Sequence, residues 1–275
     1  MSTITTTTTI DPRALEAFDQ PADEHELIDQ LLASEPRDAT AFGLYVIDGA
    51  APAAELARAV ERAVFLEYFG NTPEMLRAEY DAYEASSTFL TVIDHRRRCV
   101  AGMIRVIRPS AAGFKSLDDI EAVWRAPVDE LVREGGPGHS APDAIDIATL
   151  AVSPEYRGDA TSGLISLALY QAVTQLAGAN GMRWLIAVLD LIVLDLIQSQ
   201  TCRPFTAYAG LDPLSYLDSP SSLPVFSDLH EYAARLETLD RSMFEILFEG
   251  SGLEAAVSQP ASFRLDDRVV LAAAG

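Results

Sequence analysis

Two apolar stretches, residues 144–152 and 184–189, flank one helical pattern, and this arrangement limits the fold more than any other feature. Pro142 and Pro154 bound the first stretch, and both stretches have the length of buried strands. Between them, residues 161–179 repeat apolar side chains at helical spacing. Because two parallel neighbours need a crossover connection, this unit predicts a parallel strand pair joined by a helix.

The rest of the chain predicts further helices and an antiparallel strand pair in addition to the parallel one. Residues 88–93 and 100–107 are typical of an antiparallel hairpin, since only a short charged turn joins them. The expected fold class is therefore α+β, a mixed β-sheet flanked by helices, with additional helical segments at both ends. Helices are expected over 22–34, 52–69, 73–85, 115–133 and 191–200, and a helical tail is expected over 228–257.

The length of 275 residues allows one large domain or two small ones. Three segments are expected. Residues 1–20 are rich in threonine and predict a flexible tail, and residues 21–225 predict the main domain. Residues 226–275 predict a C-terminal helical extension that packs on that same domain.

Charge and composition exclude several classes of partner. Acidic residues outnumber basic ones by 41 to 20, giving a net charge of −21, so nucleic acid and anionic membranes are poor partners. The most apolar stretch, residues 185–197, is too short to span a membrane. Two cysteines cannot form a disulfide framework, and the four histidines share no metal-binding spacing. We therefore expect a cytoplasmic protein without a metal ion.

The segment from Leu150 to Gly163 carries the strongest chemical signal. A strand ends there, a turn follows at Pro154, and small residues lead into the long helix. The first turn of a helix presents unpaired backbone N–H groups, which bind phosphate when small side chains let it approach. Arg157 would add a positive charge beside that anion. A glycine-bearing strand–turn–helix, as any α/β protein can have, is the alternative interpretation.

Val152, Pro154, Tyr156 and Arg157 resemble the signature of the GNAT superfamily of acyltransferases, which bind acyl-coenzyme A or acyl-carrier protein. Ala160 and Ser162 stand where that signature usually has glycine. The resemblance implies an acyl thioester as co-substrate. Its binding residues would be Leu150, Val152, Arg157, Gly158, Asp159, Ala160, Thr161, Ser162 and Gly163.

A second stretch resembles the acyl-homoserine-lactone synthase and N-acyl amino acid synthase branch of that superfamily. Residues 79–84 resemble its acidic cluster, and residues 102–105 resemble its Gly-x-x-Arg motif. Glu84 replaces the usual last aspartate, Asp146 replaces a glutamate, and Thr149 replaces an arginine. These departures argue against production of a homoserine lactone and are compatible with transfer of an acyl group from a thioester to an amine.

The resemblance also suggests roles for single residues. Asp146 would accept a proton from the amine, directly or through water, or it is simply a solvated carboxylate at the start of a strand. Backbone N–H groups from Leu150 to Val152, if freed by a bulge, would polarise the thioester carbonyl. The charged residues Glu79, Asp81 and Arg105, together with Thr149, would hold the acceptor, or they form a structural salt bridge between a helix and the hairpin.

The sequence therefore predicts an acyltransferase that moves an acyl group from acyl-coenzyme A or acyl-carrier protein to a small amine. Two alternatives stay open. One is a catalytically inactive GNAT-like protein that binds an acyl carrier or a lipid-like ligand. The other is an interaction protein whose helical tail makes a homodimer contact.

Overall fold

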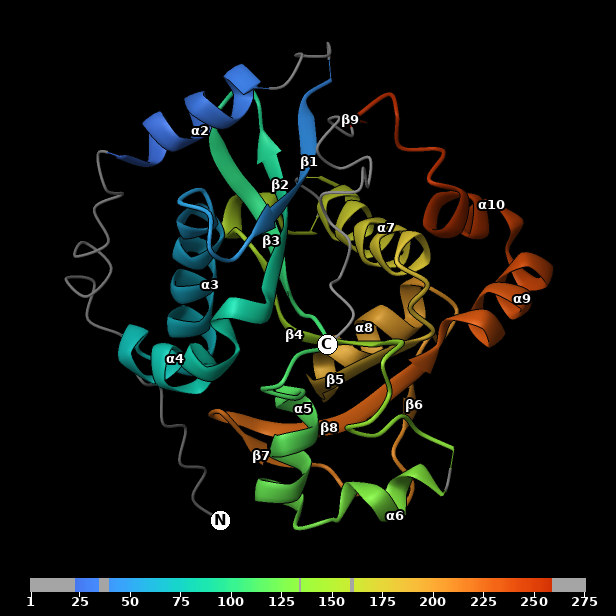
Figure 1. Ribbon diagram of the computed structural model, residues 1–275. Helices are drawn as coiled ribbons and strands as arrows, with labels where there is room; N and C mark the ends of the chain where they lie inside the picture. The colour runs from blue at the N-terminus through green and yellow to red at the C-terminus, as the bar shows by residue number, and fades with distance from the viewer. Residues whose placement is uncertain (1–22, 35–39, 134, 159–160, 259–275) are drawn as a thin grey trace, which may run out of the picture.

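A computed structural model describes residues 23–34, 40–133, 135–158 and 161–258, which form one mixed β-sheet with helices on both faces (Figure 1). The strand order is β6-β8-β5-β4-β3-β2-β1-β9, and β7 pairs with β8. Only β4–β5 and β1–β9 are parallel, and every other pair is antiparallel. The strands are β1 (Phe42–Asp48), β2 (Ser87–Asp94), β3 (Cys99–Ile107), β4 (Ala144–Val152), β5 (Trp184–Asp190), β6 (Thr206–Ala207), β7 (Leu214–Tyr216), β8 (Ser219–Asp228) and β9 (Val257–Ser258).

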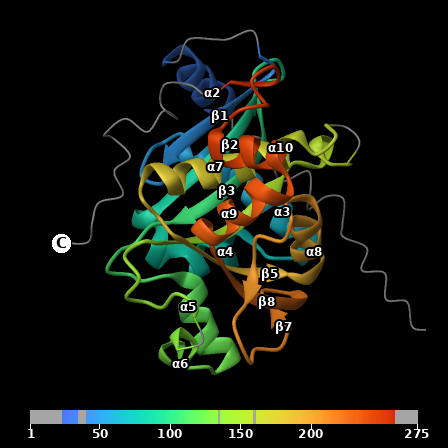
Figure 2. The same ribbon diagram turned by 90° about the vertical axis from the view of Figure 1, so that its right-hand side faces the viewer.

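The α+β fold, the β2–β3 hairpin and the parallel β4–β5 pair with its helical crossover are confirmed. Helices α2, α3 and α4 cover one face of the β1–β4 half, and α7 covers the other face (Figures 1 and 2). The α-helices are α2 (Asp23–Ser34), α3 (Ala54–Phe69), α4 (Pro73–Tyr80), α5 (Lys115–Asp119), α6 (Val128–Val132), α7 (Leu164–Ala179), α8 (Leu191–Gln200), α9 (Leu229–Leu239) and α10 (Arg241–Phe244).

The central strands are buried on both faces because helices cover both. Every residue of β2 is buried. Leu90 packs in the cluster beneath α7, whereas its neighbour Phe89 packs in the cluster beneath α2 and α3. Successive side chains of a strand point to opposite faces, so one strand supplies two cores. The sheet is thus a fixed platform between two layers of helices.

Two helices are shorter than the sequence pattern predicts. The helix expected over 73–85 ends at Tyr80 and continues as a 3₁₀ turn over Asp81–Ser86. The helix expected over 115–133 breaks into α5, a π turn over Ile120–Trp124 and α6. Arg125 adopts a left-handed backbone conformation with φ 56°, and Pro127 follows, so the helix cannot continue there.

The C-terminal part is less helical than predicted. After α9 and α10, a π turn covers Glu245–Glu249, and β9 then pairs with β1 at the edge of the sheet. The expected boundary between residues 225 and 226 falls inside β8, and residues 1–20 lie outside the described ranges, so the division into segments stays a prediction. No described helix has both the length and the apolar character that crossing a bilayer requires.

Candidate functional site

The sheet opens between β4 and β5. These strands pair only from Ala144↔Trp184 to Asp146↔Ile186, although β4 continues to Val152 and β5 continues to Asp190. Strands that exchange no backbone hydrogen bonds leave their facing N–H and C=O groups free for another partner. The open part of β4–β5 is therefore a place where a ligand can approach the backbone.

A β-bulge lies in β4 just beyond the point where the two strands part. The pairing with β3 shifts between Arg105↔Thr149 and Val106↔Ile147, which leaves Ala148 as the extra residue. The Tyr80 hydroxyl donates to the Ala148 carbonyl oxygen at 3.4 Å. The bulge expected at Leu150 to Val152 is thus misplaced, since those residues pair regularly with β3 and the register changes earlier.

A pocket lies on the side of the opening that faces α3 and β7; most of its lining is apolar, and we call it the polar pocket after the polar groups of Asp190, Tyr216 and Ser219 among that lining. The Ser219 hydroxyl donates to Asp190 at 2.7 Å, and Asp190 also caps α8 through the backbone N–H of Ile192 at 2.8 Å. The pocket is lined by Phe65, Phe69, Tyr80, Ile147, Ala148, Thr149, Leu150, Val188, Leu189, Asp190, Val193, Tyr216, Leu217, Ser219 and Ser222.

An apolar cavity lies on the other side, beneath α7, α8 and α9. It shares Ile147, Leu150 and Leu189 with the polar pocket, so these three residues border both spaces beside the opening between β4 and β5. The remaining lining residues are Ile104, Tyr170, Val173, Thr174, Leu185, Ile197, Thr201, Pro204, Phe205, Leu229, Tyr232 and Leu247. A reactive group at the opening could therefore have a polar partner on one side and an apolar chain on the other.

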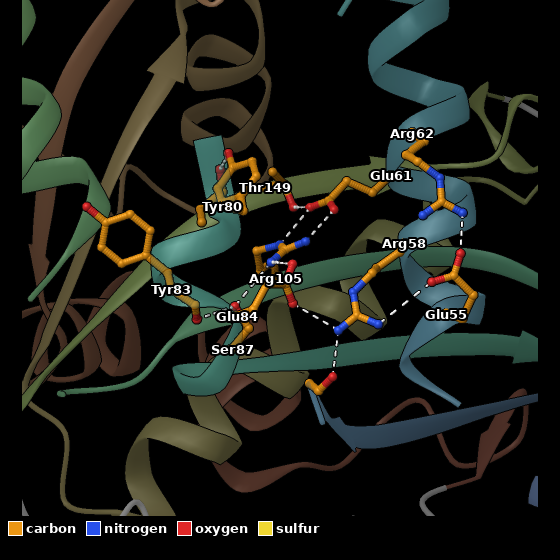
Figure 3. Close-up of polar contacts among 12 residues, drawn as sticks. Glu55, Arg58, Glu61, Arg62, Tyr80, Tyr83, Glu84, Ser87, Arg105 and Thr149 are labelled. Carbon is orange, nitrogen blue, oxygen red and sulfur yellow. Dashed lines mark hydrogen bonds and ion pairs between the residues drawn. The ribbon is translucent and has the colours of Figure 1, made fainter. Parts of the chain in front are cut away.

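Arg105 lies at the centre of a buried ion cluster between α3 and the sheet (Figure 3). Its guanidinium donates twice to Glu61, at 3.0 and 2.7 Å, and once to Glu84 at 2.8 Å. The Thr149 hydroxyl donates to Glu61 as well. We call Arg105, Glu61, Glu84 and Thr149 the arginine cluster. Burial by itself lowers the pKa of Arg105, but Glu61 and Glu84 outweigh burial and raise it.

Lys115 is the centre of a second cluster, which reaches the polar pocket through Tyr216. Its ammonium group donates to Glu79 at 2.9 Å, to Asp119 at 2.7 Å and to the Tyr216 hydroxyl at 3.1 Å. We call Lys115, Glu79, Asp119 and Tyr216 the lysine cluster. Burial lowers the pKa of Lys115, whereas Asp119 and Glu79 together raise it. Burial raises the pKa of Tyr216 well above its usual range, so this hydroxyl stays protonated.

The three charged residues predicted to hold the acceptor do not form a single ion-paired cluster. Arg105 pairs with Glu61 and Glu84 rather than with Glu79 or Asp81, and Glu79 pairs with Lys115. Asp81 is exposed on the rim of a separate charged cavity between α3 and α4. That cavity is lined by Glu55, Arg58, Glu61, Arg62, Pro73, Leu76, Arg77, Asp81, Glu84 and Arg105.

Asp146 is completely buried and is not a solvated carboxylate. One oxygen accepts from the Ser116 backbone N–H at 2.7 Å, and the other accepts from the Ser116 hydroxyl at 2.6 Å. Burial raises the pKa of Asp146 to about 6, although the hydrogen bonds from Ser116 lower it. Neither Asp146 nor its partner Ser116 lines the polar pocket.

The predicted phosphate loop lies between β4 and α7. Gly158, Ser162 and Gly163 all have left-handed backbone conformations, with φ of 58°, 51° and 75°, and the helix begins at Leu164 rather than Thr161. Asp159 and Ala160 lie outside the described residues. Thr161 donates its hydroxyl to the Tyr156 carbonyl oxygen at 2.8 Å.

Arg157 already has partners within the chain. Its Nε donates to the Val152 carbonyl oxygen at 2.6 Å, and its guanidinium contacts the Tyr68 hydroxyl and lies 3.6 Å from Glu67. These contacts tie the loop to the C-terminal end of α3. They position Arg157 beside the end of β4, but a bound anion would compete with Glu67 for its charge.

Sequence reasoning did not select Glu61, Lys115 or Tyr216. A signal for Glu61 existed, since it shares the buried face of α3 with Ala57 and Val64, where a carboxylate needs a buried cation. Lys115 is the single lysine of the chain, but composition alone does not indicate which residues it pairs with. Nothing in the local sequence marked Tyr216.

Comparisons with known proteins agree with this architecture. Residues 61–166 match the family model described as Acetyltransferase (GNAT) domain. The chain is similar to FeeM, an N-acyl amino acid synthase from uncultured soil microbes, with 15% identity and a TM-score of 0.53, over 72% of this chain and 96% of that chain. It is also similar to BjaI, a CoA-dependent acyl-homoserine lactone synthase, with 17% identity and a TM-score of 0.52, over 78% of this chain and 92% of that chain. The comparison with curated proteins gave no match.

Residues 61–166 are thus similar to a GNAT acetyltransferase domain, and the chain shares its fold with structures of an N-acyl amino acid synthase and an acyl-homoserine lactone synthase. The resemblance that the sequence motifs indicated is confirmed.

Proposed function

We propose that this protein transfers an acyl group from acyl-coenzyme A or an acyl-carrier protein to the amine of a small acceptor, in the cytoplasm. One observation carries the proposal. The opening between β4 and β5 has a polar pocket on one side and an apolar cavity on the other, and the two share Ile147, Leu150 and Leu189. A thioester placed at this opening would direct its acyl chain into the cavity and present its carbonyl carbon to the pocket.

The donor would approach along the end of β4. Leu150 and Val152 supply backbone there, and the loop from Arg157 to Gly163, with Gly158, Thr161 and Ser162 in it, leads to the N-terminus of α7. Unpaired N–H groups at the start of a long helix favour phosphate oxygens. We assign this loop, including Asp159 and Ala160, to the phosphates of coenzyme A or of a carrier's phosphopantetheine arm.

The bulge at Ala148 would help the chemical step. The bulged residue Ala148 has no partner on β3, so its backbone N–H is not used in the β3–β4 pairing. The Tyr80 hydroxyl donates a hydrogen bond to the Ala148 carbonyl oxygen. Backbone N–H groups near the bulge could therefore stabilise the negative charge that develops on the thioester oxygen. Thr149, next along the strand, is held in place by its hydrogen bond to Glu61.

The acceptor amine must lose a proton during the reaction. A pKa of about 6 makes Asp146 an ionised carboxylate at neutral pH that is still more basic than an ordinary aspartate. Because both of its oxygens accept hydrogen bonds from Ser116, a proton would reach it through the Ser116 hydroxyl. We keep Asp146 as the proposed proton acceptor, and Glu79, Asp81 and Arg105 as residues that shape the acceptor side.

The second candidate is a binding protein without turnover. The contacts of Arg157 with Val152, Tyr68 and Glu67 favour it, because they occupy the guanidinium that would otherwise face a phosphate. Such a protein would still hold an acyl chain in the apolar cavity.

Thermal unfolding with coenzyme A and acyl-coenzyme A of increasing chain length tests the proposal, together with release of free thiol in the presence of small amines. A ligand at a hundred times its dissociation constant stabilises the folded state by about 2.7 kcal/mol, which a melting curve resolves. Stabilisation that depends on chain length, with thiol release, supports the transferase. Stabilisation without thiol release supports the binding protein, and no stabilisation by any thioester contradicts both.

A further inference from the structure

The apolar cavity has two ends that come from different parts of the chain. Its near end, Ile147, Leu150 and Leu189, lies at the opening between β4 and β5. Its far end includes Thr201, Tyr232 and Leu247, all of which follow the segment that matches the GNAT family model. The depth of the cavity is therefore set by the C-terminal part of this chain.

Three hydroxyl groups in the cavity wall donate hydrogen bonds to backbone carbonyl oxygens. Thr174 donates to Gln171 at 3.0 Å, Thr201 donates to Ile197 at 2.7 Å, and Tyr232 donates to Thr201 at 2.6 Å. A polar ligand group would have to break one of these bonds, at the cost of an unsatisfied buried group. The occupant that suits this wall is a hydrocarbon chain.

A strained turn borders the far end. Cys202 and Arg203 follow one another with φ of 55° and 58°, a left-handed conformation that is unfavourable for residues other than glycine. They stand between Thr201 and Pro204, which both line the cavity. Backbone strain of this kind persists only where the surroundings enforce it, and it occurs at ligand-binding elements.

Side chains of α9 enforce the closed turn from outside. Tyr232 donates to the Thr201 carbonyl oxygen, while the Arg235 guanidinium donates to the carbonyl oxygens of Cys202 and Arg203. Arg235 is exposed and stacks on Tyr232, with 5.6 Å from its central carbon to the ring centroid. Arg235 thus clamps the turn without belonging to the core.

We propose that the turn at residues 201–205, clamped by Arg235, sets the longest acyl chain that the protein accepts. The inference rests on the proposed function, because it takes the donor's acyl chain as the occupant of the cavity. A chain that extends past the far end of the cavity at Thr201 and Pro204 must displace the turn. The clamp opposes that movement, and the strain at Cys202 and Arg203 favours it, so the turn opens as a unit when the chain is long enough.

The test compares wild type with Arg235→Ala, using saturated fatty acids from hexanoate to palmitate as probes in thermal unfolding. We expect the wild type to be stabilised up to a limiting chain length, and the variant to extend that limit. For the first acid beyond the wild-type limit, the affinity should rise about tenfold, since two hydrogen bonds from a charged donor no longer hold the turn. Arg235→Lys should lie between the two, because an ammonium group can still reach one carbonyl oxygen.

The control variant is Arg96→Ala, which removes an equal charge from the exposed β2–β3 turn and should keep the wild-type limit. The same limit in wild type and Arg235→Ala overturns the inference, as does the absence of stabilisation by any fatty acid in both proteins. Thiol release from the acyl-coenzyme A series is measured in parallel. An extended limit without thiol release supports the clamp and contradicts the transferase.

Discussion

The arginine cluster and the lysine cluster have the same composition and different surroundings. Each joins one cation to two carboxylates and a hydroxyl, next to the polar pocket. In the arginine cluster the Arg105 and Glu61 side chains are both only 2% exposed, and Glu84 is 33% exposed. In the lysine cluster Lys115 is 4% exposed, but its partners Asp119 and Glu79 are 17% and 37% exposed. The Arg105–Glu61 pair is thus enclosed between a helix and the sheet, whereas both carboxylates of the lysine cluster are partly exposed.

This difference indicates different roles. The planar guanidinium of Arg105 engages Glu61 through two parallel hydrogen bonds, which fixes the angle between β3 and α3. The ammonium group of Lys115 is a point charge on a flexible chain, and it joins α4, α5 and β7. The arginine cluster therefore holds the platform, while the lysine cluster holds the elements that surround the pocket.

The largest expected effect is that of Arg105→Met, which leaves Glu61 buried without a cation. Breaking a buried ion pair in this way costs about 3–5 kcal/mol of unfolding free energy. Urea unfolding measures it. The matched control Arg62→Ala removes the partly exposed pair with Glu55 on the same helix, and it should cost less than about 1 kcal/mol. Equal losses in the two variants would contradict an enclosed arginine cluster.

The next effect is a pH dependence that arises beside the lysine cluster, where Asp146 anchors Ser116. Because its pKa rises from 3.8 to about 6 on folding, the folded state binds this proton more tightly than the unfolded state does. The free energy of unfolding that this proton contributes is fully present below the unfolded-state pKa of 3.8, and it is lost as pH rises to about 6. It amounts to roughly 3 kcal/mol across that window.

Asp146→Asn should remove this pH dependence and, if Asp146 accepts the proton, lower turnover more than substrate binding. Urea unfolding from acidic to neutral pH measures the first effect, and thiol release measures the second. A variant with the wild-type slope between pH values of about 4 and about 6 would show that another group titrates there. Unchanged turnover would remove Asp146 from the proposed mechanism.

Lys115→Met removes the cation of the lysine cluster, whose carboxylates are partly exposed. Its carboxylate partners can regain water, so the loss should be about 2 kcal/mol, which is typical of hydrogen bonds to charged groups. Urea unfolding at neutral pH checks this value, and Lys115→Arg is the variant that keeps the charge. A loss as large as that of Arg105→Met would mean that Glu79 and Asp119 are effectively desolvated.

The smallest effect on stability is expected for Arg157→Glu, since Arg157 and Glu67 form a partly exposed pair. The loss should stay below about 1 kcal/mol, yet coenzyme A should bind about tenfold more weakly because like charges meet at the loop. Titration with coenzyme A measures the affinity, and Arg157→Gln separates lost attraction from added repulsion. Unchanged affinity in Arg157→Glu would place the phosphates elsewhere.

Local patterns predicted the parts of the fold that depend on neighbouring residues. Apolar periodicity located β2, β3, β4, β5 and α8, because the spacing of apolar residues along an element shows which of its faces are buried. The same reasoning failed at residues 115–133. There the amphipathic pattern continues through Arg125, but the backbone turns left-handed and the helix breaks.

The sequence by itself thus determined the fold class, the parallel unit around α7 and the presence of Arg105 on β3. Only the tertiary structure decided which carboxylates meet each cation. Glu61 lies 44 residues before Arg105, and Tyr216 lies 101 residues after Lys115. Pairing over such distances follows from strand register and helix packing, and so does the bulge at Ala148. A buried charge requires a partner, but the partner's identity is fixed only when the sheet brings distant segments together.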